Sequence, residues 1–219
     1  MNLKEMRENL KWCQKLVWIT RVRFPVRRIL FVGRKNCGRS AASEYYFRKY
    51  CYWWDQLEAC SSGGDIRGKG ACKTFVWKNR EVYAKARSKL SKQAVRFLIS
   101  YEPKEFSAEL LDSVDLVLTM DECVAKELSF KFRSMRYKIF TLKGFVDREK
   151  RSTSWNCLDI GSTKGKEITN VNEILNSILE VKKYIRQLVN ILDYLEDEVK
   201  SSGVNSDGPR EASAWREGH

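Results

Sequence analysis

The pattern of hydrophobic and polar positions predicts strands that alternate with helices. Short apolar runs at residues 28–32, 57–61, 114–120 and 137–142 have the length that is typical of buried strands. Apolar residues at helical spacing predict helices over residues 39–51, within 65–105, after Asp121 and from Val171 to about residue 198. Alternating strands and helices form a parallel sheet covered by helices, with ligands at the carboxyl ends of the strands. The predicted fold class is therefore α/β.

The two ends of the chain differ from this central region. Residues 1–24 carry apolar side chains at helical spacing with Lys and Arg between them, which predicts a basic amphipathic helix. Packing on its own domain or on a second copy is the favoured interpretation, and contact with an anionic membrane is the alternative. Residues 199–219 are rich in Ser, Gly and charge and are predicted to be disordered. We expect a basic extension over 1–27, an α/β domain over 28–198 and a tail over 199–219, with no signal peptide or membrane-spanning stretch.

The loop after the first predicted strand has the features of a phosphate-binding site. Two glycines let the backbone turn its N–H groups inward, and the helix start that follows adds free donors and a partial positive charge. Arg39 would lie at that helix start, with a planar fork that suits two phosphate oxygens. An ordinary strand-to-helix turn is the alternative. The predicted phosphate-binding residues are Gly33, Arg34, Lys35, Asn36, Cys37, Gly38, Arg39 and Ser40.

One interpretation of this loop is a divergent nucleotide-binding P-loop. Residues 33–40 fit the spacing G-x-x-x-x-G-K-[ST], except that Arg39 stands where the motif has Lys. Ser40 would then bind magnesium, and Asp121 would be the magnesium-binding aspartate at a strand end. A magnesium-dependent nucleotide hydrolase is therefore one candidate function, although Arg and Lys are not interchangeable at such a site.

A second interpretation rests on a longer match. Residues 32–44 align without a gap with V-C-x-G-N-x-C-R-S-P-x-A-E, the signature of the low-molecular-weight protein tyrosine phosphatases. Residues 115–121 read DLVLTMD and resemble the D-L-V-L-x-M-D strand of that family, and residues 107–111 resemble its lead-in. The matching positions of the signature are Val32, Asn36, Arg39, Ser40 and Glu44. The resemblance covers about residues 28–195 and implies a four-stranded parallel sheet flanked by helices.

The departures from the phosphatase signature concern its chemistry. The first residue of the family's loop is the nucleophilic cysteine, and Gly33 occupies that position here. Cys37 is a poor replacement because it lies two residues before Arg39 and its side chain should leave the loop in another direction. The family's general acid is an aspartate followed by proline and an aromatic residue; Asp159 is the nearest remnant and Asp147 a weaker one. The resemblance therefore implies a phosphatase-like pseudoenzyme, with a residual tyrosine phosphatase as the alternative.

Histidine and cysteine usage excludes several classes of site. The single histidine is His219, which leaves no Ser-His-Asp triad, Cys-His pair or H-E-x-x-H zinc motif. The cysteines form no C-x-x-C pair, so they predict free thiols in a reducing cytosol rather than a disulfide scaffold or a zinc finger (Cys13, Cys37, Cys51, Cys60, Cys72, Cys123 and Cys157). We expect a cytoplasmic protein with no metal and no cofactor.

The positive charge is concentrated near the beginning of the chain. Residues 1–50 hold 13 Lys and Arg against three acidic residues, and so carry +10 of the net charge of +13. Such a field attracts phosphate-bearing partners, whether small anions, nucleic acid or an anionic membrane surface. General solubility charge is the alternative. The sequence leaves a further partner, including a homo-oligomer, open.

Overall fold

The fold is taken from a computed structural model, which describes residues 26–34, 38–51, 58–63, 80–102, 104–146 and 171–201. The helix predicted for residues 1–24 and most of the predicted tail lie outside the described residues. In the part of the chain that is described, no helix is both long enough and apolar enough to cross a membrane.

Four parallel strands form one sheet. They are β1 (Arg28–Gly33), β2 (Glu58–Gly63), β3 (Leu116–Thr119) and β4 (Ile139–Thr141), in the order β2-β1-β3-β4. β1 pairs with β2 and with β3, and β3 pairs with β4, all in parallel. The predicted four-stranded parallel sheet is confirmed.

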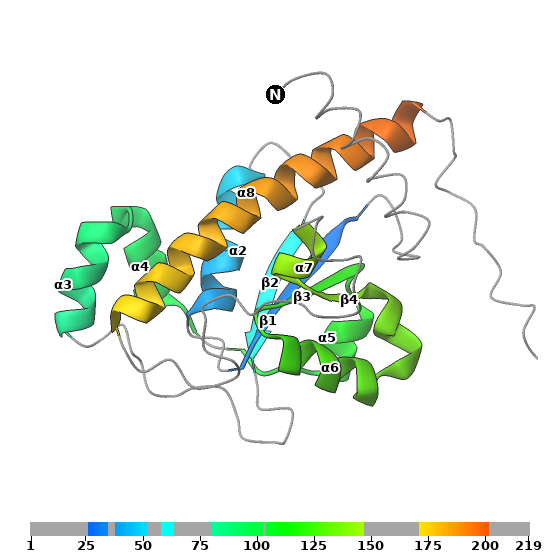
Figure 1. Cartoon of the computed structure of the whole chain (residues 1–219), viewed down its shortest axis with the longest axis horizontal. Coiled ribbons are helices and arrows are strands. Elements are labelled where there is room, and N and C mark those ends of the chain that lie inside the picture. Colours follow the sequence, from blue (N-terminus) through cyan, green and yellow to red (C-terminus); the bar gives the residue numbers. More distant parts are fainter. Residues whose placement is uncertain are drawn as a thin grey trace, which may run out of the picture.

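Helices cover both faces of this sheet (Figure 1). One face is covered by α2 (Arg39–Tyr50), α4 (Lys92–Ser100), α7 (Leu142–Val146) and the long α8 (Val171–Ser201), with α3 (Arg80–Lys89) beside α4 and α8. The other face is covered by α5 (Ala108–Asp112) and α6 (Glu122–Lys131), and the 3-10 helix η2 (Arg133–Lys138) leads from α6 to β4. The sheet is therefore the middle layer of three.

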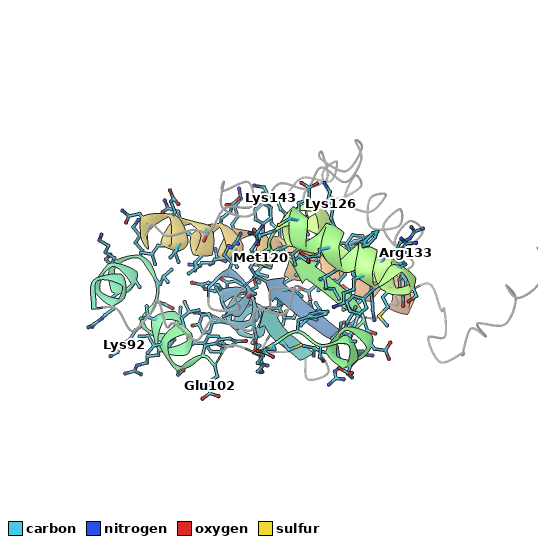
Figure 2. The ribbon with its side chains drawn as sticks, turned by 90° about the horizontal axis from the view of Figure 1, so that it is seen from below. Lys92, Glu102, Met120, Lys126, Arg133 and Lys143 are labelled. Atoms are coloured by element: carbon cyan, nitrogen blue, oxygen red, sulfur yellow. The ribbon has the colours of Figure 1, made fainter. Side chains whose placement is uncertain are left out.

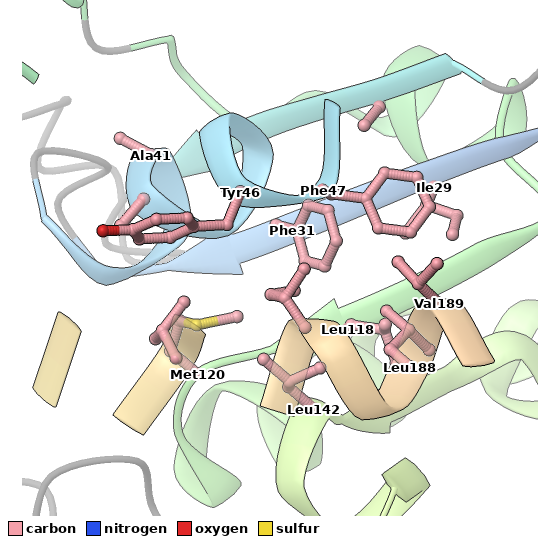
Figure 3. Packing of buried hydrophobic residues seen from close by; sticks show 14 of the residues in the cluster. Ile29, Phe31, Ala41, Tyr46, Phe47, Leu118, Met120, Leu142, Leu188 and Val189 are labelled. Atoms are coloured by element: carbon pink, nitrogen blue, oxygen red, sulfur yellow. The ribbon is translucent and has the colours of Figure 1, made fainter. Parts of the chain in front are cut away.

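Alternate residues of the central strands explain the two hydrophobic cores. Ile29 and Phe31 of β1 and Leu118 of β3 enter the core beneath α2 and α8, where Leu188 packs with them (Figure 3). Leu30, Val32 and Val117 point to the opposite face and join the core beneath α5 and α6. Because both faces are covered, these strands read as continuous apolar runs rather than as alternating ones.

Several predicted boundaries differ from the structure. β4 is shorter than the predicted strand over 137–142, because residues 137 and 138 belong to η2 and Leu142 begins α7. The helix α7 then continues to Val146, and its residues Phe145 and Val146 are buried in the core. The described part of the predicted helical segment 65–105 contains two helices, α3 and α4. α8 continues to Ser201, so residues 199–201 are helical rather than part of the tail.

Candidate functional site

The predicted phosphate loop lies at the carboxyl edge of the sheet. β1 ends at Gly33 and α2 begins at Arg39, so the described ends of this connection, residues 33–34 and 38–39, lie at the carboxyl end of β1 in the middle of the sheet. β1 lies between β2 and β3 in the sheet. The chain therefore leaves β1 towards one edge of the sheet, where β2 lies, and leaves β3 towards the other edge, where β4 lies. In open α/β sheets the crevice at such a switch point is where ligands bind.

The first turn of α2 favours an anion. Gly38 is the residue before the helix, its carbonyl accepts a hydrogen bond from the Ala42 N–H at 2.8 Å, and no side chain caps the helix at this position. The first turn contains no acidic residue. Amide groups and the positive end of the helix dipole therefore point towards the loop without a neighbouring carboxylate in that turn.

Arg39 is held in place by a carboxylate from β3's end of the sheet. Its Nη1 and Nη2 atoms donate to Oδ1 and Oδ2 of Asp121 at 2.7 and 2.8 Å. The Asp121 side chain is 2% exposed and that of Arg39 is 15% exposed. This two-point geometry is the strongest form of a guanidinium–carboxylate contact, and it fixes the plane of the Arg39 fork.

The same contact engages the side chain of Asp121 at the start of α6. The residue does occupy the position before α6, as an N-cap residue would, but its side chain makes no capping hydrogen bond. Both carboxylate oxygens bind Arg39 instead. No group of three or more His, Cys, Asp or Glu that could hold a metal ion occurs among the described residues.

The space at Gly33 is filled by a hydroxyl group. A Cβ atom added to Gly33 would lie 2.8 Å from Ser40 Oγ, 3.3 Å from Ser40 Cβ and 3.8 Å from Met120 Cγ. Ser40 is 1% exposed. A side chain at residue 33 therefore requires the Ser40 hydroxyl to rotate out of its present position.

Buried polar contacts anchor the start of α2 to the sheet. The Ser43 hydroxyl donates to the Arg39 carbonyl at 2.9 Å and contacts Met120 Sδ at 3.4 Å. The Met120 N–H donates to the Val32 carbonyl at 2.9 Å, which joins the end of β3 to the end of β1. The backbone around Arg39 is therefore braced from both strands that flank the loop.

Glu44, which matches the phosphatase signature, has a structural environment. It is 4% exposed, accepts a hydrogen bond from the Tyr101 hydroxyl at 3.2 Å and pairs with Arg48 at 2.9 Å. Arg48 also donates to the Ala59 carbonyl at 2.7 Å. Glu44 thus connects α2 with the end of α4 and, through Arg48, with β2, rather than facing a ligand.

The structure adds Cys123 to the surroundings of the predicted loop, which the sequence did not indicate. Arg34 follows Gly33 directly, and its Nη2 atom lies 2.7 Å from the sulfur of Cys123 in the first turn of α6. Cys123 is exposed and is a free thiol. The sequence gives no signal for this contact, because residues 34 and 123 are neighbours only through the pairing of β1 with β3.

The structure brings together Gly33, Arg34, Gly38, Arg39 and Ser40 of the predicted loop. Lys35, Asn36 and Cys37, together with the acid candidates Asp147 and Asp159, lie outside the described residues. Aromatic residues of α2 pack within the domain, because Tyr46 is 3% exposed and Tyr45 packs on Phe97.

Comparisons with known proteins agree with this architecture. The family model described as low molecular weight phosphotyrosine protein phosphatase matches residues 28–201. The chain is similar in structure to a YwlE arginine phosphatase from Geobacillus stearothermophilus, with a TM-score of 0.55, 20% identity, and coverage of 82% of this chain and 99% of that one. It is also similar to a low molecular weight protein tyrosine phosphatase from T. tengcongensis, with a TM-score of 0.52, 24% identity, and coverage of 74% and 97% respectively.

No curated protein sequence gives a significant match. The solved relatives are distant enough to speak for the fold alone. The family model covers most of the chain and begins at the first residue of β1. The chain therefore belongs to the low molecular weight phosphotyrosine protein phosphatase family.

Proposed function

We propose that this protein is a phosphatase-like pseudoenzyme that binds phosphate or a phosphorylated ligand at residues 33–40 without covalent catalysis. The observation that carries the proposal is the occupation of the nucleophile's position by Gly33, together with the Ser40 hydroxyl that fills the space of its missing side chain. Covalent phosphoryl transfer needs a nucleophilic side chain that attacks phosphorus. Glycine has none, so this route is removed while the surrounding cradle remains.

Phosphate would be held by groups from three sources. The backbone N–H groups of the loop and of the first turn of α2 supply neutral donors, and Arg39 supplies a charged one whose orientation Asp121 fixes. Arg34 and Lys35 would add positive charge at the rim, while Asn36 and Ser40 would brace the loop. Donors that are already oriented bind an anion with little loss of conformational freedom.

The two alternative chemistries have less support. A nucleotide hydrolase would use Asp121 as a magnesium ligand, but its two oxygens already bind a guanidinium group. A residual phosphatase would use Cys37 as nucleophile and Asp159 as general acid, but Cys37 lies only two residues before Arg39, and Asp159 is followed by Ile160 and Gly161 in place of proline and an aromatic residue. We therefore keep phosphate binding as the proposed function.

A thermal-shift titration with inorganic phosphate and phosphotyrosine tests the binding. Ligands that bind the folded state raise its melting temperature by mass action, so millimolar ligand reveals a weak site. Wild type should be stabilised, and Arg39→Lys should lose most of this effect, because lysine keeps the charge opposite Asp121 but lacks the fork. Arg96→Lys on the exposed side of α4 is the matched control and should behave as wild type.

An assay of aryl phosphate hydrolysis tests the absence of catalysis. Wild type should release no more aryl alcohol than buffer. Turnover that disappears in Arg39→Lys and persists in Arg96→Lys would contradict the pseudoenzyme proposal. A melting temperature that responds only to magnesium-ATP would favour the nucleotide hydrolase instead.

A further inference from the structure

The turn between α3 and α4 has exposed cations on both of its sides. α3 ends at Lys89 and α4 begins at Lys92, so only two residues separate the helices. Four exposed cations lie around this turn, and we call them the α3–α4 cluster: Lys85, Arg87, Lys89 and Lys92. Figure 2 shows Lys92 at the side of the molecule opposite Arg133 of η2.

The exposed side chains of this helix pair are polar or positively charged. Within residues 85–100, the exposed residues outside the cluster are Ser88, Ser91, Gln93, Arg96 and Ser100. No acidic residue occurs in this segment, and none of its exposed residues is apolar. Lys, Arg, Ser and Gln are side chains that donate hydrogen bonds to the phosphates of nucleic acids. The composition of this surface therefore suits a chain of phosphate groups.

Helix stability explains only part of this charge. Arg87 and Lys89 lie in the last turn of α3, where the negative end of the helix dipole favours cations. Lys92 lies in the first turn of α4, where the positive end of the dipole disfavours a cation, and no acidic residue accompanies it there. Lys85 and Lys89 are four residues apart on α3, and like charges at this spacing destabilise a helix. A bound polyanion would relieve both unfavourable interactions.

Acidic residues lie at the margins of the α3–α4 cluster. Residues 80–100 contain six Lys and Arg against one acidic residue, Glu81, and so carry a net charge of +5. Glu102 follows the end of α4. On α8, the exposed Glu173 precedes Asn176 by three residues, and Asn176 Oδ1 accepts a hydrogen bond from Lys89 Nζ at 3.5 Å. The helix pair thus keeps a strong positive charge.

The shortage of exposed apolar side chains favours a nucleic acid over a membrane. A helix that lies on a membrane buries an apolar face in the lipid. The apolar face of α4 is already buried in the core of the domain. The exposed large hydrophobic residues of the described chain lie on other elements, and they are Phe130, Tyr137 and Leu179. The α3–α4 cluster therefore provides charge and hydrogen-bond donors but no anchor for lipid.

We propose that the α3–α4 cluster binds the phosphate backbone of a nucleic acid. Double-stranded DNA carries one negative charge per about 1.7 Å of its axis, so several phosphates fall within the span of two short helices. Phosphate contacts carry no sequence information, so binding should not depend on base sequence. The cluster shares no residue with the phosphate loop at residues 33–40, and the proposal is therefore independent of the proposed function.

Fluorescence anisotropy of the full chain with a labelled DNA duplex of about 20 base pairs tests the proposal. Affinity should fall as the NaCl concentration rises from about 50 to about 200 mM, with a slope of about −0.9 per phosphate contact in a plot of log K against log salt. Lys89→Glu/Lys92→Glu should weaken binding at least about tenfold and reduce the magnitude of the slope by about two. Lys89→Gln/Lys92→Gln, which adds no carboxylates, should reduce the slope equally.

The control is Lys131→Glu/Arg136→Glu, which reverses two exposed charges on α6 and η2 and changes the net charge by the same amount. This variant should bind the duplex as wild type does. An equal loss of affinity in the control would overturn the proposal, because net charge would then explain binding. Unchanged affinity in Lys89→Glu/Lys92→Glu, or a wild type that does not bind the duplex at low salt, would overturn it too.

Two further measurements separate the α3–α4 cluster from other binding sites. Inorganic phosphate at constant ionic strength should leave duplex binding unchanged. Competition by phosphate would place the duplex at the phosphate loop and overturn the proposal. Vesicles that contain phosphatidylserine should bind wild type and Lys89→Glu/Lys92→Glu equally. Selective loss of vesicle binding in the variant, with duplex binding unchanged, would assign the cluster to lipid and overturn the proposal.

Discussion

The centre of the sheet and its carboxyl edge are stabilised by different kinds of interaction. At the centre, Phe31, Leu116 and Leu118 are completely buried among apolar neighbours. At the edge lie most of the buried polar residues of the described chain: Ser40, Ser43, Thr119, Asp121 and Thr141. Ser43, Thr119, Asp121 and Thr141 each make a hydrogen bond, such as that of Thr119 to the Asp121 carbonyl and that of the Gly144 N–H to Thr141.

Stability and ligand binding should therefore depend on different parts of this fold. Apolar burial has no preferred direction, so the centre tolerates exchanges that conserve volume. Buried polar groups need particular partners, and losing one partner leaves the other unsatisfied in a low-dielectric environment. Changes at the edge should therefore alter stability and ligand binding together, whereas changes at the centre should alter stability alone.

Asp121→Ala should give the largest effect. It leaves the largely buried Arg39 guanidinium without its carboxylate partner, so the free energy of unfolding should fall by about 3–5 kcal/mol. Urea denaturation measures this change. The double variant Arg39→Met/Asp121→Leu, which removes both charges, should recover part of the loss. A decrease below about 1 kcal/mol in Asp121→Ala would contradict this expectation, because it would equal the contribution of a pair at the surface.

Leu118→Ala tests the centre of the sheet. Removal of this fully buried side chain should lower the free energy of unfolding by about 2–5 kcal/mol through lost burial and the cavity that remains. The dissociation constant for inorganic phosphate, measured by calorimetry well below the melting temperature, should not change. A parallel loss of phosphate affinity would break the separation between centre and edge.

Gly33→Cys should have a smaller effect on stability and a large one on chemistry. The new Cβ forces the Ser40 hydroxyl into another rotamer, which should cost about 1 kcal/mol. A thiolate at this position can attack phosphorus, so the variant should release aryl alcohol from an aryl phosphate. Gly33→Ala is the matched control, with the same Cβ contact and no nucleophile. Equal release by both variants would contradict the assigned role of residue 33.

Two buried groups, Cys51 and Tyr46, should affect the free energy of unfolding only at alkaline pH. Burial, with a smaller contribution from Asp193, raises the pKa of the Cys51 thiol from 9.0 to about 12. Burial and the neighbouring Tyr50 and Tyr45 raise the pKa of Tyr46 from 10.0 to about 12. The folded state therefore favours the protonated forms, and this stabilisation is complete below pH 9 and is lost as the pH rises towards 12.

The free energy of unfolding should accordingly fall between pH 9 and 12. The fall should be shallower in Cys51→Ala, whereas Cys123→Ala, at an exposed position, should follow wild type. Urea denaturation midpoints measured across this pH range test the predicted difference between Cys51→Ala and wild type. Identical slopes for Cys51→Ala and wild type would show that Cys51 ionises in the folded state as it does in the unfolded one.

Much of the architecture could be predicted from local patterns. The apolar runs in β1 and β3 are continuous because both faces of these strands are covered. The alternation of strands with helices predicted the parallel arrangement, and the family resemblance implied a sheet of four strands. Boundaries were less accurate where short elements meet. Lys138 would extend β4 by its position in the sequence, but it lies in η2, where its Nζ donates to the Val114 carbonyl at 2.8 Å. A contact between residues 24 positions apart leaves no local signal.

Local periodicity and residue identity encode the four strands, the helix that starts at Arg39 and the glycine at residue 33. Three contacts arise only from the tertiary fold: Asp121 binds Arg39, the Ser40 hydroxyl lies in the space beside Gly33, and Arg34 contacts Cys123. Arg39 and Asp121 are 82 residues apart, and Arg34 and Cys123 are 89 apart. The parallel pairing of β1 with β3 brings the carboxyl ends of both strands to one edge, and that long-range arrangement joins these residues into one site.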